Sequence, residues 1–170
     1  MIRIATPADA ATLASLGRDT FIETWVHTFA MGYSPEDLAA YLAAQFDPGH
    51  IEDLVRASDS QWLLAEVDGD PVAYAYSGPC GLPHPEARRE HGELKRLYVR
   101  RAHQGTGLGR ALLERSLAWL GDRFDGPVWL GVWSGNLKAQ KLYGAHGFGK
   151  VGEYDYPVGR TLDREFIFRR

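Results

Sequence analysis

Hydrophobic and polar residues follow two periods along the chain, and the changes between these periods divide it into strands and helices. Short apolar runs rich in β-branched and aromatic residues predict strands at residues 2–4, 61–67, 71–78, 92–99 and 127–133. Two further runs, 148–156 and 161–169, predict a closing antiparallel pair. Apolar residues at helical spacing predict helices after Thr6, over 34–46, over 50–58, from the glycine turn to about Asp122, and over 136–147.

Capping and turn residues support these boundaries. Thr6 and Ser34 are each followed by a proline, which is the arrangement of an N-cap residue and a first helical residue. The first helix fades near Phe21 to Trp25. The helix after Ser34 presents one apolar face, made of Leu38, Tyr41, Leu42 and Phe46. The sequence "DGD" at 68–70 predicts a hairpin turn between two strands.

The helix that follows the glycine turn carries an unusually wide apolar stripe. Arg110, Glu114 and Arg115 lie on the opposite side of the helical wheel. A stripe of this width is typical of a helix that lies on a sheet. The stripe consists of Leu108, Leu112, Leu113, Leu117, Trp119 and Leu120.

Length and composition set the broad class. With 170 residues, 45% of them hydrophobic, and a net charge of -3, the chain is expected to form one α/β domain over residues 1–170. The weakly acidic balance argues against nucleic acid as a partner. No apolar run is long enough to span a bilayer and the N-terminus lacks a signal-peptide core, so the expected location is the cytoplasm. Cys80 is the only cysteine, which excludes an internal disulfide and predicts an unreactive thiol.

The stretch "QGTGLG" at 104–109 raises the question of function. Three glycines directly before a helix leave backbone N–H groups unpaired at the positive end of the helix dipole, which predicts an anion site, although a flexible turn without ligand is the alternative. A P-loop requires Lys and Ser or Thr after the last glycine, where Arg110 and Ala111 stand. A dinucleotide fingerprint requires a different spacing of the third glycine.

The stretch "QGTGLG" at 104–109 resembles a motif of the GNAT superfamily of N-acetyltransferases, Q/R-x-x-G-x-G/A. The downstream sequence "NLKAQKLYGAHGF" resembles a second element of that family, through Asn136, Ala139, Tyr143, Gly147 and Phe148. Both motifs occur in the family's order, and the resemblance extends along nearly the whole chain. It implies the GNAT fold: a central, mostly antiparallel sheet with splayed fourth and fifth strands, flanked by helices.

The resemblance further implies acetyl-CoA as co-substrate and direct transfer to a small-molecule amine acceptor. The pyrophosphate of CoA would lie on the amides of Gln104, Gly105, Thr106, Gly107, Leu108, Gly109 and Arg110. The pantetheine arm would lie along Leu97, Tyr98 and Val99, where a backbone amide could polarise the thioester carbonyl. The other wall of the cleft would contain Asn136, Ala139 and Tyr143.

Two catalytic residues follow from the same resemblance. Tyr143 is the candidate general acid for the departing thiolate, although helical spacing alone favours a core aromatic with a satisfied hydroxyl. Glu93, on the central strand, is the candidate general base that takes a proton from the acceptor amine. The alternative for Glu93 is an ion pair with Lys95, Arg96 or Arg88, and solvent or another carboxylate is an alternative base.

Several segments look like the bacterial polyamine N-acetyltransferases, so a polyamine is one candidate acceptor, and Glu23, Glu93 and Asp155 are the carboxylates expected near it. Three alternatives remain open: a peptide or protein acetyltransferase, an acyl-CoA-binding module without catalysis, and a nucleotide-dependent α/β enzyme. The histidines show no ligand spacing, so no metal is expected. No membrane partner is expected, and a homodimer is a possible assembly.

Overall fold

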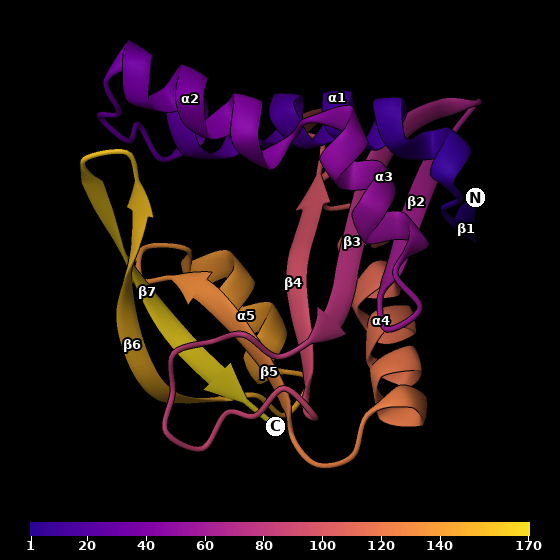
Figure 1. Ribbon diagram of the computed structural model, residues 1–170, viewed down its shortest axis with the longest axis vertical. Helices are drawn as coiled ribbons and strands as arrows, with labels where there is room; N and C mark the ends of the chain where they lie inside the picture. Colours follow the sequence, from indigo (N-terminus) through magenta and orange to yellow (C-terminus); the bar gives the residue numbers. More distant parts are fainter.

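Seven strands form one sheet in the computed structural model, which describes residues 1–170 (Figure 1). The spatial order is β1-β2-β3-β4-β5-β7-β6, so the last strand of the chain lies between β5 and β6. Only β4 and β5 are parallel, and every other neighbouring pair is antiparallel. The strands are β1 (Ile2–Ile4), β2 (Gln61–Val67), β3 (Asp70–Pro79), β4 (Gly92–Val99), β5 (Val128–Trp133), β6 (Gly149–Val158) and β7 (Thr161–Arg169).

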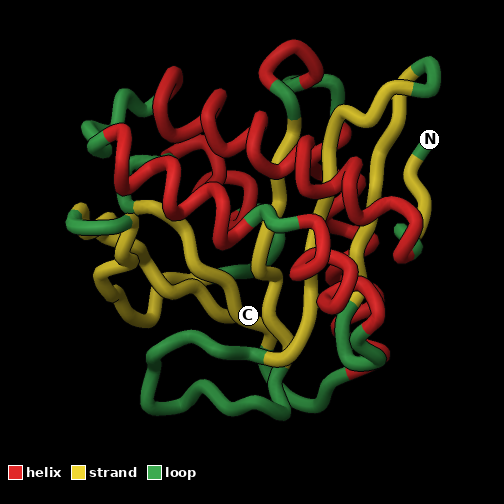
Figure 2. Tube along the Cα trace, turned by 45° about the horizontal axis from the view of Figure 1, so that its top comes forward, coloured by secondary structure: helices red, strands yellow, loops and turns green.

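Helices cover both faces of this sheet (Figures 1 and 2). They are α1 (Ala10–Phe21), α2 (Pro35–Gln45), α3 (Pro48–Arg56), α4 (Leu108–Arg123) and α5 (Leu137–Gly144), with short turns η1 (Pro7–Asp9) and η3 (Arg101–His103). The core is therefore divided by the sheet. On β2, Leu63 and Ala65 pack with α4, whereas Trp62 and Leu64 pack with α1 and α3, as the period of two in a strand requires.

The sheet splits between β4 and β5. These strands pair only where Gly92–Leu94 lies beside Val128–Leu130, and beyond Leu94 they separate. The pairing of β4 with β3 shifts at this point, because Tyr76 lies opposite Arg96 while Ser77 lies opposite Leu94, which leaves Lys95 as an extra residue. A bulge of this kind bends the strand that carries it. The expected fold, a mostly antiparallel sheet with splayed fourth and fifth strands, is confirmed.

Most boundaries lie where the sequence places them. Ser34 caps α2 by accepting a hydrogen bond from the N–H of Asp37 (3.1 Å), and the apolar stripe of α4 is buried against the sheet. The helix that fades near Phe21 in the sequence instead continues as a π-helical turn, η2 (Ile22–Thr28). No helix combines the length and apolar character needed to cross a membrane.

Candidate functional site

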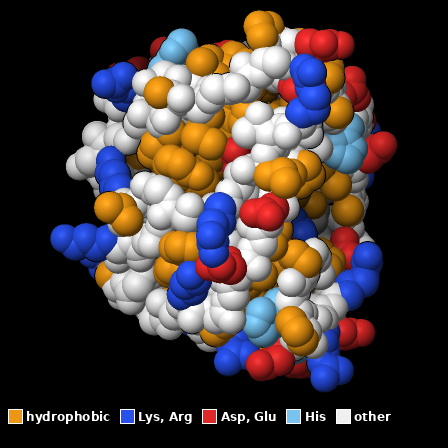
Figure 3. Space-filling view, turned by 90° about the vertical axis from the view of Figure 1, so that its left-hand side faces the viewer, with side chains coloured by type: hydrophobic (Ala, Val, Ile, Leu, Met, Phe, Trp, Pro, Cys, Tyr) orange, Lys and Arg blue, Asp and Glu red, His pale blue; other side chains and the backbone are white.

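The separation of β4 and β5 opens a cleft of about 730 Å³. It extends from the first turn of α4, past the exposed edge of β4, to the ends of β6 and β7 and the aromatic side chains of η2. In Figure 3, hydrophobic side chains gather in a hollow of the molecular surface, with basic side chains at its edge. A cleft through a sheet exposes unpaired strand edges and helix ends to one ligand, which few other surfaces of an α/β protein do.

The glycine turn at one end of the cleft has the geometry of an anion site. Gly105 and Gly107 have positive φ angles of 82° and 90°, which residues with a Cβ rarely adopt. No backbone N–H from Gly105 to Arg110 donates to an acceptor in the protein, and Ala111 is the first that does, to Gly107 (3.0 Å). These free donors lie at the positive end of α4, so they fit the pyrophosphate of a coenzyme A molecule.

One backbone amide of the expected phosphate site, that of Gln104, differs from the prediction. The N–H of Gln104 donates to the carbonyl of Arg101 (3.3 Å), so it is not free for a phosphate. The side chain of Gln104 joins the two walls instead: its Nε2 donates to the carbonyl oxygen of Val99 (3.2 Å), and its Oε1 accepts from Lys138 of α5 (3.0 Å).

The structure brings most of the predicted binding residues to the cleft. Thr106 and Leu108 are the exceptions, because the Thr106 hydroxyl donates to the carbonyl of His103 (2.7 Å) and the Leu108 side chain packs against the core. These two residues offer only their backbone N–H groups. The predicted residues that do line the cleft are Glu93, Leu97, Tyr98, Val99, Gln104, Gly105, Gly107, Gly109, Arg110, Asn136, Ala139 and Tyr143.

Asn136 also has a local structural role. Its Oδ1 accepts a hydrogen bond from the N–H of Ala139 (3.0 Å) and so caps α5. The cap fixes the start of the helix that carries Ala139 and Tyr143 to the cleft wall.

Tyr143 is 8% exposed, and its hydroxyl forms no hydrogen bond within the protein. Its ring packs edge to face on Phe148, with centroids 6.1 Å apart. Burial raises the pKa of the Tyr143 phenol, and the charge of Glu165 raises it further. The phenol therefore keeps its proton at neutral pH and is available as a donor inside the cleft.

Glu93 both lines the cleft and holds a neighbouring loop in place. Its Oε2 accepts hydrogen bonds from the N–H of Gly81 (2.7 Å) and from the ammonium of Lys95 (3.0 Å). Of the ion-pair partners that the sequence left open, Lys95 is the one found.

Two acids that the sequence reasoning missed lie in the same cleft, Asp163 and Glu165 of β7. Asp163 is 2% exposed; one oxygen accepts from the Tyr33 hydroxyl and the other, Oδ1, has no partner. Glu165 accepts a hydrogen bond from the Tyr154 hydroxyl (3.3 Å). Their spacing of two residues in a predicted strand places both on one face, and this spacing is the only signal that the sequence offers.

Burial raises the pKa values of both β7 acids. For Asp163 the hydrogen bond from Tyr33 opposes this shift. Burial raises the pKa of Glu165 to about 7; the hydrogen bond from Tyr154 lowers it, and the charges of Asp163 and Glu93 raise it. Three carboxylates thus share one partly buried space, which favours a positively charged ligand.

Two of the carboxylates that were expected near an acceptor lie elsewhere. Glu23 forms an ion pair with Arg100 (3.1 Å) and accepts from the N–H of Arg101 (2.9 Å). Asp155 is exposed on β6 and does not line the cleft. The expectation that the Glu23 and Asp155 carboxylates border the cleft is therefore wrong, because other residues of their segments face it: Thr24 and Trp25 on η2, and Tyr154 and Tyr156 on β6.

Cys80 is buried, and burial raises its pKa to about 11, so its thiol stays protonated. No group of three or more His, Cys, Asp and Glu side chains is arranged to hold a metal ion.

Free amides at a helix start, beside a split between two parallel strands, form a site that fits coenzyme A. The chain belongs to the Acetyltransferase (GNAT) family, whose sequence pattern matches residues 19–148. It is an acetyl-CoA-dependent N-acetyltransferase.

Individual relatives agree with this assignment. An uncharacterized N-acetyltransferase of Mycobacterium tuberculosis is 28% identical over 162 residues, which cover 95% of this chain and 97% of that one. A spermine/spermidine N(1)-acetyltransferase of Bacillus subtilis is 27% identical over 101 residues, 58% of this chain and 65% of that one. The PaiA N-acetyltransferase of Thermoplasma acidophilum, solved in complex with coenzyme A, has a TM-score of 0.73 at 18% identity and covers 100% of this chain and 97% of that one.

Proposed function

We propose that the enzyme transfers the acetyl group directly from acetyl-CoA to a small amine with more than one positive charge, such as a polyamine. The observation that carries this proposal is the acidic, aromatic end of the cleft, where Glu93, Asp163 and Glu165 converge. The partial similarity to the spermine/spermidine N(1)-acetyltransferase of Bacillus subtilis supports the same acceptor class.

The two ends of the cleft have opposite electrostatic character. The amides from Gly105 to Arg110 attract the phosphates of the donor, and the edge of β4 beyond Leu94 offers backbone groups to the pantetheine arm. At the other end, the rings of Trp25, Phe29 and Trp133 pack together. Aromatic faces beside carboxylates bind ammonium groups through cation–π contacts and charge attraction.

Asp163 supplies the reason to expect a second charge on the acceptor. Its Oδ1 is buried without a partner, and an unpartnered buried carboxylate oxygen is costly. An ammonium group bound near Asp163 satisfies this oxygen while a second amine of the same molecule reaches the thioester.

Tyr143 protonates the sulfur of the leaving thiolate. Its high pKa makes it a weak acid in isolation, but the apolar wall that raises the phenol pKa also raises that of the departing thiol. The proton transfer then accompanies cleavage of the carbon–sulfur bond, and the loss of one proton from Tyr143 is restored from the attacking nitrogen.

The acceptor nitrogen must lose a proton before it attacks, since amines are protonated at neutral pH. Glu93 is the carboxylate that the family resemblance assigns to this step, directly or through a water molecule. It shares the cleft wall with two other carboxylates, Asp163 and Glu165.

The test is a comparison of kcat/KM for spermidine, a dipeptide with a free N-terminus, and glutamate. We expect spermidine to react fastest and its advantage to shrink as salt is added, because ions screen the attraction between charges. A faster reaction with the dipeptide would favour a peptide or protein N-terminal acetyltransferase. Tight CoA binding without turnover on any amine would instead identify a non-catalytic acyl-CoA-binding module.

A further inference from the structure

Glu165 lines the cleft together with Glu93 and Asp163. It lies on β7, opposite Trp133 of β5 and Tyr154 of β6. A Cβ at Gly131 of β5 would lie 2.9 Å from Glu165 Oε2 and 3.0 Å from the Tyr154 hydroxyl. The carboxylate and the phenol therefore meet over a position that is free only because residue 131 is glycine.

Glu165 also differs from Glu93 in what already binds it. Glu93 Oε2 accepts from Gly81 and from the ammonium of Lys95. Glu165 accepts one hydrogen bond, from Tyr154, and no cation stabilises its charge. The carboxylate of Glu165 is therefore not engaged by a cation of the protein and is free to meet a positively charged ligand in the cleft.

We propose that Glu165, rather than Glu93, accepts the proton of the acceptor amine. This proposal rests on the proposed function, acetyl transfer to an amine, and assigns a catalytic residue within that site. Glu93 then acts as a positioning residue, because it holds the loop at Gly81 and contributes negative charge beside the amine.

The proton balance of the step is complete without a further reactant. Glu165 takes one proton from the ammonium, and the free nitrogen forms a bond to the thioester carbon. The carbon–sulfur bond then breaks, and the sulfur leaves with its electron pair and receives the proton of Tyr143. A second proton from the nitrogen restores Tyr143, and the proton on Glu165 passes to water, so each turnover releases one proton.

The surroundings of Glu165 set the pH range in which this step operates. Its pKa of about 7 lies near neutral pH, where a general base is most effective. Below this range the protonated Glu165 cannot act as a base, so the rate falls. The titratable groups that face it from the surrounding elements are Tyr33, Glu93, Tyr98, Tyr143, Tyr154 and Asp163.

The experiment compares pH profiles of kcat/KM for the parent, Glu165→Gln and Glu93→Gln with the best amine acceptor. We expect Glu165→Gln to lose about 10²–10⁴-fold in rate at pH 7 and to lose the inflection near pH 7. Glu93→Gln should keep that inflection. Asp155→Asn, an exposed carboxylate on the neighbouring strand, is the matched control and should behave as the parent.

A weakly basic amine, such as trifluoroethylamine, separates proton transfer from packing. It is already neutral at pH 7, so Glu165→Gln should reduce its rate far less than that of a strongly basic amine. Gly131→Ala provides a second variant, since its methyl group displaces the Glu165 carboxylate. It should show the same discrimination between the two amines.

The outcomes are distinguishable. A Glu165→Gln variant that keeps the parental rate and inflection, or a Glu93→Gln variant that loses the inflection, would overturn the assignment of Glu165 and leave the proposed function standing. A parent enzyme that acetylates no amine would overturn both proposals.

Discussion

At the scale of single residues, Tyr143 shows how burial converts a common aromatic into a candidate acid. Its ring is held by Phe148, while its hydroxyl has no partner in the protein. Spacing in the sequence alone favours a packing role for Tyr143, so its chemical role depends on the surroundings of the hydroxyl in the folded protein.

Replacing Tyr143 with Phe keeps the ring and removes only the proton. We expect kcat to fall by about 10²–10⁴-fold while the dissociation constant for CoA stays near the parental value. Steady-state kinetics and calorimetric titration measure the two quantities. Tyr74→Phe is the matched control, because the Tyr74 hydroxyl is buried without a partner outside the cleft and should not affect kcat. Parental kcat in Tyr143→Phe would leave this residue a packing role.

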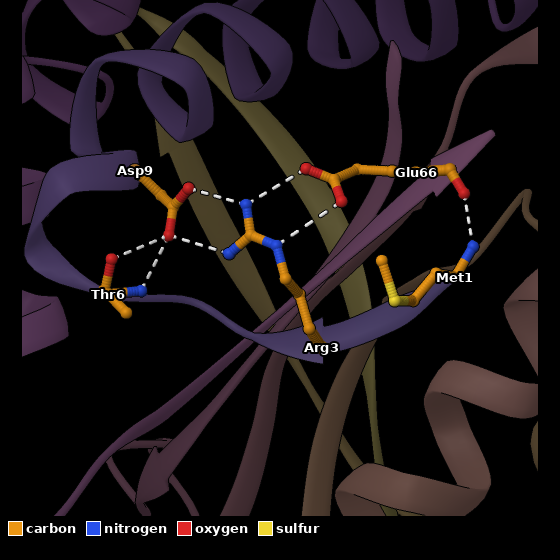
Figure 4. Close-up of polar contacts among 5 residues, drawn as sticks. All are labelled: Met1, Arg3, Thr6, Asp9 and Glu66. Atoms are coloured by element: carbon orange, nitrogen blue, oxygen red, sulfur yellow. Dashed lines mark hydrogen bonds and ion pairs between the residues drawn. The ribbon is translucent and has the colours of Figure 1, made fainter. Parts of the chain in front are cut away.

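A second residue-scale feature lies far from the cleft and concerns stability. The guanidinium of Arg3 makes two hydrogen bonds to Asp9 (2.7 and 2.9 Å) and two to Glu66 (3.0 and 3.3 Å), as Figure 4 shows. These bonds join β1 to η1 and to β2. The hydrogen bonds from Arg3 hold the pKa of Asp9 well below its usual range.

We expect Asp9→Asn to lower the free energy of unfolding by about 1–2 kcal/mol at pH 7. Since the folded pKa of Asp9 is depressed, its contribution is present above the unfolded pKa of about 4 and is lost as the pH falls toward the folded value. The difference between parent and variant should therefore shrink below about pH 4. Urea unfolding at several pH values measures it, and Asp125→Asn, an exposed acid, serves as control.

At the scale of elements, the glycine turn and the first turn of α4 place different demands on their glycines. The turn needs positive φ angles at Gly105 and Gly107, so any other residue there is strained. Gly109 differs, because it lies in the first helical turn and a Cβ there would meet only Val99 Cγ2, at 3.6 Å, an ordinary contact. It is the position where a side chain can be added without disturbing the protein itself.

We expect Gly109→Ala to maintain or raise thermal stability, since Ala favours a helix over Gly by about 0.5–1 kcal/mol. CoA affinity should nevertheless fall by about 10–100-fold, because the methyl group stands where phosphates approach the amides and weakens charge-assisted hydrogen bonds. Gly121→Ala, exposed in the same helix, is the matched control, and it should gain stability without affecting CoA binding. Unchanged CoA affinity in Gly109→Ala would remove the phosphates from this turn.

At the scale of the whole molecule, the two parts of the sheet are joined by the short parallel contact between β4 and β5, over Gly92–Leu94 and Val128–Leu130. A ligand in the cleft contacts both parts, so its binding energy adds to the cohesion of the fold. The strands β1 and β2 lie beyond β3 and take no part in the cleft.

We expect CoA at about 100 times its dissociation constant to stabilise the protein by about 2.7 kcal/mol and to raise Tm by about 5–11 °C. Amide hydrogen exchange should slow most at Gly105–Arg110, where the free protein has no acceptors, and least in β1 and β2. Equal protection of all strands would indicate general stabilisation without a defined phosphate site. The cytoplasmic location, the single-domain organisation and a homodimer stay predictions.

The sequence alone determined the local elements and the donor end of the site. Apolar periodicity, capping by Ser34 and the glycines at 105–109 act between residues that are close in the chain, so they can be read without knowing which strands are neighbours. The apolar stripe of α4 predicted its burial for the same reason. Family motifs added the mostly antiparallel sheet with splayed fourth and fifth strands and the identity of the donor.

Only the tertiary structure decided which acids face the acceptor. Because β7 inserts between β5 and β6, it carries Asp163 and Glu165 into the cleft, whereas Arg100 engages Glu23 and solvent surrounds Asp155. The sequence alone does not distinguish the acids that face the cleft from those that do not, because all of them are charged residues within predicted elements. The pKa values and roles of these acids depend on their burial and on their partners from distant segments. Burial and partners follow from the order of the strands, which no local sequence pattern encodes.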